Sequence, residues 1–225
     1  MNTFNFKINP YNQKLIKAFL ILIAFFSILT AIDSTGQMSS FLSLSSFSLE
    51  KKHFWQLTTY IFLLPNPAVS IGFILRLAIN LYIFWFCTSF ITKWKGSWQL
   101  FWFIFSATLF FTLVALPLLS FFPMPLFGLN ILMCSIVVAW LMLAGDLRFH
   151  LFHFTIKAKW MVLNLILIRV FYNFYLGFHL AAILNILVAL FTYLYALIIW
   201  RHKSPFPGLS AFEEPLTRLF KKKEK

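Results

Sequence analysis

The chain has 225 residues, of which 61% are hydrophobic and only 11% are charged. Charged residues make up about a quarter of a typical globular domain, so one water-soluble core cannot enclose these apolar groups and lipid must solvate much of the surface. The net charge of +13 does not indicate a nucleic-acid-binding protein, because the Lys and Arg residues lie between and beyond the apolar runs and form no single basic face.

The apolar runs are long and continuous, which predicts an all-α protein. Barrel strands, the other structure that satisfies backbone polar groups in hydrocarbon, would alternate apolar and polar residues over about ten positions. A bilayer core is spanned by about 20 helical residues. We therefore predict a polytopic six-helix transmembrane bundle, with helices over Leu15–Ile32, Ser70–Ile91, Trp98–Leu119, Leu126–Leu143, Trp160–Tyr175 and Phe178–Trp200.

These runs divide the chain into a cytoplasmic N-terminal segment (1–14), a transmembrane domain (15–200) and a basic cytoplasmic tail (201–225). A signal peptide is the rival interpretation of the first run, since Lys14 and Lys17 flank its start, but no clear Ala-x-Ala site follows it. Residues 33–67 are mixed in polarity, which predicts a long interfacial loop with short helical pieces. The tail is either a solvated charge run or lies on anionic lipid.

The Lys and Arg residues predict the orientation, because positive charge concentrates in cytoplasmic loops. One alternating set of connections carries nearly all of these cations, and the other carries only Lys51 and Lys52. We therefore place both termini in the cytoplasm. High Phe, Ile, Leu, Lys and Asn usage is typical of an AT-rich bacterial genome, so a bacterial inner membrane is the first assignment and the endoplasmic reticulum membrane the second.

Of the polar residues within the predicted helices, five are singled out as candidates: Arg76, Asn80, Asn130, Arg169 and Asn185. A charge at the bilayer centre costs a few kcal/mol, so such residues usually face the bundle interior or snorkel to the interface. Asn80 shares a helical face with Arg76, because four residues separate them. The buried amides need hydrogen-bond partners. Together these residues predict a hydrated cavity within the bundle.

Several motifs surround these polar residues. WQLTTYIFLL begins at Trp55, and RLAINLYIFWFCTSFITKWKG runs from Arg76 to Gly96. FGLNILMCS contains Gly128, and FTYLYALI ends the last apolar run. These segments resemble the rhomboid superfamily, including its derlin branch, in the runs W-R-L-x-T-x-F-L, H-x-x-x-N-x-x-x-L-W-x-F-G-x-x-L-E-x-x-x-G, G-x-S-G-x-x-x-G and G-Y-L-Y. The resemblance implies six spans with cytoplasmic termini.

The same resemblance implies an inactive member. An active rhomboid cleaves peptide bonds inside the membrane with a Ser nucleophile and a His base. In the best register Asn130 stands at the Ser position and Asn185 at the His position, although Asn80 of the oxyanion-hole pattern remains. An amide is neither a base near neutral pH nor a good nucleophile. The resemblance therefore implies a pseudoprotease without cofactor that binds transmembrane segments of client proteins and steers their folding, trafficking or degradation.

Two alternatives stay open. Ser135 and His179 would form a catalytic dyad in a shifted register, which makes the chain an active intramembrane serine protease. Arg76 and Arg169 could instead line the path of a small anion carrier or channel, although no inverted repeat is visible.

Two further groups of residues say less about function. Asp146, His150 and His153 flank one turn but lack a fourth ligand, so we expect no metal site there. Cys87 and Cys134 lie in apolar runs and are predicted to be inert buried thiols.

Overall fold

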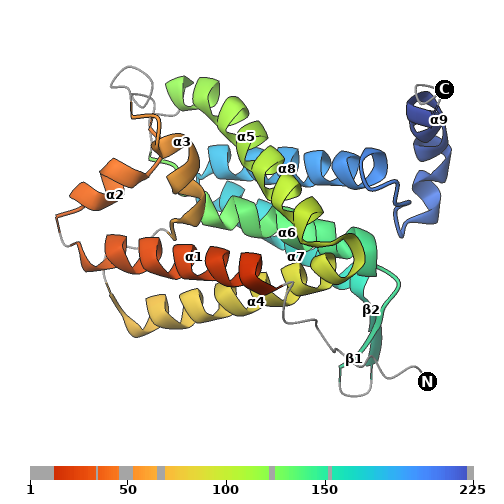
Figure 1. Cartoon of the computed structure of the whole chain (residues 1–225), viewed down its shortest axis with the longest axis horizontal. Coiled ribbons are helices and arrows are strands. Elements are labelled where there is room, and N and C mark those ends of the chain that lie inside the picture. Colours follow the sequence, from red (N-terminus) through yellow and green to blue (C-terminus); the bar gives the residue numbers. More distant parts are fainter. Residues whose placement is uncertain are drawn as a thin grey trace.

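The structure is a computed structural model that describes residues 13–33, 35–45, 53–64, 69–121, 125–151 and 154–221. The described chain is helical apart from one short hairpin (Figure 1). In chain order the helices and strands are α1 (Lys14–Ile32), α2 (Gln37–Leu42), α3 (Gln56–Thr59), η2 (Tyr60–Phe62), α4 (Ile71–Lys95), α5 (Ser97–Phe121), α6 (Leu129–Ala144), β1 (Arg148–Leu151), β2 (Phe154–Lys157), α7 (Ala158–Tyr175), α8 (His179–Ile198), η3 (Pro207–Leu209) and α9 (Ser210–Lys221).

Each of the six predicted helices is present, as α1, α4, α5, α6, α7 and α8. Four helices of the described chain, α1, α4, α5 and α8, are long and apolar enough to cross a membrane. Helix α6 is apolar but has only 16 residues. Helix α7 has 18 residues and carries Lys159 and Arg169. The structure is therefore that of a helical membrane-embedded protein.

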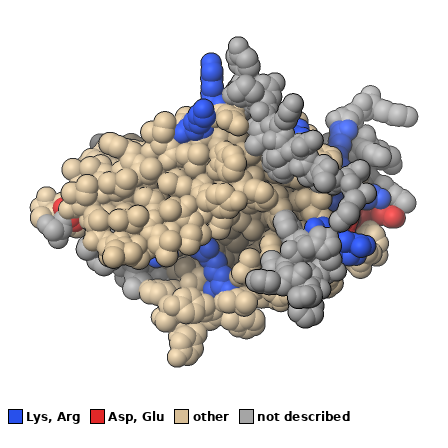
Figure 2. Space-filling view, turned by 90° about the horizontal axis from the view of Figure 1, so that it is seen from below, with Lys and Arg blue, Asp and Glu red and all other residues tan. Residues whose placement is uncertain are grey.

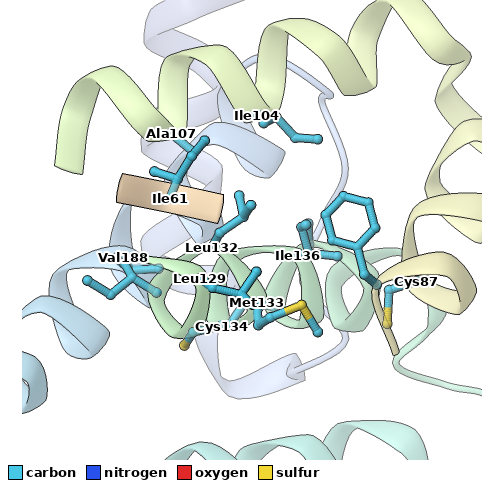
Figure 3. Close-up of a cluster of buried hydrophobic side chains, with 14 of the residues drawn as sticks. Ile61, Cys87, Ile104, Ala107, Leu129, Leu132, Met133, Cys134, Ile136 and Val188 are labelled. Atoms are coloured by element: carbon cyan, nitrogen blue, oxygen red, sulfur yellow. The ribbon is translucent and has the colours of Figure 1, made fainter. Parts of the chain in front are cut away.

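Helix α6 lies at the centre of the bundle. Nearly all of its residues are buried, and it packs against α4, α8, α7 and α5. A helix that is apolar on every side is stable only when other apolar groups surround it. Figure 3 shows the packing around it, with Leu132 and Ile136 on the side that meets Ile61 and Ile104, and with Cys134 on the other side of the helix.

The chain between α1 and α4 folds back onto the bundle, and it contains the short helical pieces that the sequence predicts, α2, α3 and η2. The Ser27 hydroxyl of α1 donates to the carbonyl of Phe62 at 3.0 Å and accepts from the amide of Leu64 at 3.3 Å. Leu44 and Leu126 exchange two backbone hydrogen bonds, of 3.2 Å and 2.8 Å. Because of this bridge, α6 begins at Leu129, three residues later than predicted.

The start of α1, the β1–β2 hairpin and α9 lie at one end of the bundle, and α2 and α3 lie at the other (Figure 1). We call the first the lysine-rich end, because it carries Lys14, Lys17, Lys93, Lys95, Lys157, Lys159 and Lys203. Lys51 and Lys52, which the orientation prediction placed opposite, lie outside the described residues, as do residues 1–12 and 222–225.

The basic tail is packed against the lysine-rich end. Lys159 Nζ donates to the carbonyl of Pro205 at 2.6 Å, and Tyr193 donates to the buried carboxylate of Glu213 at 2.7 Å. A Cβ atom on Gly145 would lie 2.4 Å from the ring of Pro205, so only glycine allows this contact without a shift. The first half of the tail is therefore part of the folded structure.

Candidate functional site

The motif that begins at Trp55 holds helix α2 in place. The indole of Trp55 and the side-chain amide of Gln56 both donate to the carbonyl of Phe41, at 3.0 Å and 2.9 Å. The hydroxyl of Thr59 donates to the carbonyl of Leu42 at 2.9 Å. The last carbonyls of a helix have no partner within it, so these side chains satisfy the end of α2. The polar positions of this motif thus have a structural role.

The two motif glycines also have structural roles. The amide of Gly128 donates to the carbonyl of Tyr60 at 2.7 Å, and a Cβ atom on Gly128 would lie 2.6 Å from the Tyr60 ring. Gly128 thus lets η2 approach the start of α6. Gly96 has a φ of +88° and ends α4 with a hydrogen bond from its amide to the carbonyl of Thr92. Most residues avoid that backbone conformation, which glycine adopts readily.

Asn130 and Asn185 stand on neighbouring helices, but no hydrogen bond joins them within the described bundle. Asn130 is half-buried at the start of α6. Asn185 is buried in α8, and its Oδ1 has no hydrogen-bond partner. Its backbone carbonyl instead faces Cys134 of α6, whose Sγ lies 3.9 Å away. An unsatisfied buried acceptor costs about 1–3 kcal/mol, so the unpaired Oδ1 of Asn185 lowers the stability of the bundle.

Ser135 and His179 do not meet. The Ser135 hydroxyl is buried and accepts a hydrogen bond from Thr192 at 3.2 Å. His179 lies thirteen positions before Thr192 on the same helix, which corresponds to a rise of about 20 Å. Its ring is exposed and packs beside that of Phe174, with 5.8 Å between the ring centroids. The nucleophile and base of the alternative dyad are therefore separated by most of the length of α8.

Arg76 and Arg169, which we call the arginine pair, lie on different helices. Arg76 is exposed on α4, and Arg169 is half-buried on α7. Within the described chain, neither guanidinium forms a hydrogen bond or an ion pair. Each of these two cations inside an apolar helix thus lacks a charge partner among the described residues.

Helices α4 and α7 both expose apolar side chains on the surface of the bundle. Both pack against α6, but over their full lengths they do not pack closely against each other. Figure 2 shows Lys or Arg side chains that interrupt an otherwise uncharged surface beside a hollowed region. The exposed apolar side chains include Leu75 and Ile79 of α4 and Leu165, Ile168 and Tyr172 of α7. We call this region the α4–α7 face; it also contains the half-buried Asn80 and lies beside the arginine pair.

The structure also places the two cysteines and Asp146. Cys87 and Cys134 are free and buried, as predicted. Asp146 forms an ion pair with Lys159, with 3.3 Å between Oδ1 and Nζ. His153 lies outside the described residues. Among those that the structure describes, no three His, Cys, Asp or Glu residues are grouped to hold a metal ion.

The sequence alone did not single out Cys134 as a neighbour of the polar residues. Its spacing could have done so, because it follows Asn130 by four residues and therefore shares a face of α6 with it.

Comparison with known proteins finds neither a matching family model nor a matching curated sequence.

Proposed function

We propose that this chain is a rhomboid-like membrane protein that binds transmembrane segments of other membrane proteins at the α4–α7 face and does not hydrolyse them. The observation that carries the proposal is the exposed apolar surface of α4 and α7, which Arg76 and Arg169 interrupt without a hydrogen bond or ion pair among the described residues. Such a face fits a helix that is itself apolar with a polar interruption. Binding of this kind would serve the folding, trafficking or degradation of membrane proteins.

In this proposal α6 and α7 also cross the membrane, which gives six spans. At 1.5 Å per residue they extend about 24 Å and 27 Å, somewhat less than the hydrocarbon thickness of about 30 Å. Local thinning of the bilayer accommodates such a mismatch. The lysine-rich end lies in the cytoplasm by the positive-inside rule, and a bacterial inner membrane remains the first assignment.

The absence of hydrolysis is supported by the residues at the positions that match the family's dyad. Asn130 and Asn185 provide neither an activated nucleophile nor a base. Ser135 accepts a hydrogen bond from Thr192, far along α8 from His179. A serine whose hydroxyl has no nearby base is not activated for attack.

Site-specific photo-crosslinking in cell membranes tests the proposal. A photoreactive amino acid at Asn80 or Asn130 should crosslink a limited set of membrane proteins. Leu109 is the matched control, because it is 52% exposed on α5, away from the α4–α7 face. Crosslinks to lipid alone at Asn80 and Asn130, or the same protein products from Leu109, would contradict the proposal.

A further inference from the structure

We infer that η3 and α9 together lie on an anionic lipid surface at the lysine-rich end, with Leu209, Phe212 and Leu216 inserted into the boundary between headgroups and acyl chains. The inference is independent of the proposed function, because it requires only that the long helices of the bundle cross a membrane. Three features carry it: the amphipathic pattern of α9, its level and direction relative to the bundle, and the charge of the tail.

The apolar side chains of η3 and α9 form one stripe. Leu209, Phe212 and Leu216 are three and four residues apart, a spacing that places side chains on one face of a helix. Leu209 and Phe212 are 40% and 65% exposed, and Leu216 is half-buried. Glu214 is exposed two positions after Phe212 and therefore lies on the opposite side of the helix. A helix with one apolar and one polar side is the form that lies in a bilayer interface.

The stripe is not the side of α9 that is fixed to the bundle. That side carries Glu213, whose buried carboxylate accepts hydrogen bonds from the hydroxyl of Tyr193 at 2.7 Å and from the amide of Ser204 at 3.3 Å. These contacts hold α9 against the end of α8, but they leave most of the Phe212 side chain uncovered. The described chain therefore provides no core for the apolar stripe.

The tail is held at the level where a membrane surface is expected. Trp94, Trp98 and Trp160 are exposed at the lysine-rich end, and tryptophan is enriched at the boundary between lipid and water. The ring of Phe206 packs edge-on against that of Trp160, with 6.0 Å between the ring centroids, and η3 begins at the next residue. From there α9 runs across the direction of α1 and α8 (Figure 1). Since α1 and α8 are long enough to cross the membrane, α9 lies along its surface.

The charges of the tail favour an anionic lipid surface. Helix α9 contains two acids before Thr217, the engaged Glu213 and the exposed Glu214. The sequence after Thr217 adds one acid and five cations: Glu224, and Arg218, Lys221, Lys222, Lys223 and Lys225. Basic segments beside a membrane gain about 1 kcal/mol per residue from acidic headgroups. A leaflet that contains acidic lipid offers both the apolar layer that covers Phe212 and the negative charge that these cations attract.

The test measures the depth of two positions of α9 in the full-length chain, reconstituted into nanodiscs of phosphatidylcholine and phosphatidylglycerol. Phe212→Cys and Glu214→Cys each receive an environment-sensitive fluorophore. The native cysteines are buried, and the unsubstituted chain is the labelling control. Nitroxide lipids should quench position 212 at least about threefold more than position 214, and aqueous iodide should do the reverse, since an interfacial helix buries its apolar face about 5–10 Å.

Two further measurements separate the apolar and the charged contributions. Leu209→Cys labels the other exposed position of the stripe and keeps Phe212, so it should show the same protection from iodide. In nanodiscs of phosphatidylcholine alone, this protection should fall at least about twofold, because the attraction to acidic headgroups is lost. Lys221→Gln/Lys222→Gln/Lys223→Gln should cause a similar fall in the mixed lipid.

Three outcomes would overturn the inference. Iodide quenching at positions 209 and 212 as strong as at position 214 would show that the stripe faces water. Protection from iodide without quenching by nitroxide lipids would show that protein covers the stripe, either a second copy of the chain or another partner. Equal protection in the two lipid compositions would show that acidic headgroups have no part in holding α9.

Discussion

The chain uses its positive charges in opposite ways in two regions. At the lysine-rich end, Lys159 is nearly buried between the carboxylate of Asp146 and the carbonyl of Pro205. Lys95 donates to the carbonyl of Trp200 at 3.0 Å and lies over its ring. Between α4 and α7, Arg76 and Arg169 have no such partner within the described chain. One set of cations closes the fold, and the other makes no contact of that kind.

This contrast indicates where binding should be sought. A buried charge is tolerated when it is paired and hydrogen-bonded, and it is costly when it is not. The contacts of Lys159 and Lys95 join the tail to the helices, so they are explained by folding alone. The arginine pair has no explanation of that kind. It is therefore the stronger candidate for a functional site, although both regions carry cations near helix ends.

The largest expected effect concerns Lys159. Lys159→Leu should lower the free energy of unfolding by about 2 kcal/mol, because a charge-assisted hydrogen bond is lost and the Pro205 carbonyl stays unpaired. The tail should also become more sensitive to protease near residues 200–209. Thermal unfolding in detergent and limited proteolysis measure both. Lys203→Leu removes an exposed cation and should be neutral; equal effects of the two variants would show that Lys159 is not a structural cation.

A smaller effect should follow pH at the same end. Burial, and then the charge of Lys95, lower the pKa of His202 below its usual value of 6.5. As the pH falls, His202 therefore takes up a proton in the unfolded chain before it does so in the folded chain. Its contribution to the stability of the folded chain is complete above pH 6.5 and is lost as the pH falls through the folded pKa. The loss should stay below about 1 kcal/mol, because half of the ring is solvated. His202→Gln should remove this part of the pH dependence in thermal melts.

The sequence was sufficient to predict all six long helices. Continuous apolar runs leave no alternative in lipid, and α1, α4, α5, α6, α7 and α8 each overlap a predicted range. Helix α4 ends at Lys95, four residues later than predicted. The start of α6 was wrong by three residues, because the backbone bridge of Leu44 and Leu126 is a contact across the chain that local pattern cannot indicate. The short helices α2, α3 and η2 between α1 and α4 were predicted only as short helical pieces of a loop, without their individual bounds.

The candidate site was less predictable. Position alone identified Arg76, Asn80, Asn130, Arg169 and Asn185 as unusual, because polar groups inside apolar runs are rare. It did not indicate which of these residues would be in contact, since contacts between helices depend on the crossing angle of each pair and on the rotation of each helix about its axis. The packing joins Ser135 to Thr192 and leaves it far along α8 from His179. The contact of Glu213 with Tyr193 was also missed, because the tail was interpreted from its charge.

The most direct test of the contrast is the thermal stability of the purified, partner-free chain after removal of the arginine pair. Arg76→Leu/Arg169→Leu should raise the unfolding temperature, since two charges without a partner among the described residues are replaced by apolar groups. A fall in the unfolding temperature comparable to that of Lys159→Leu would show that the pair has partners inside the chain and would contradict the account.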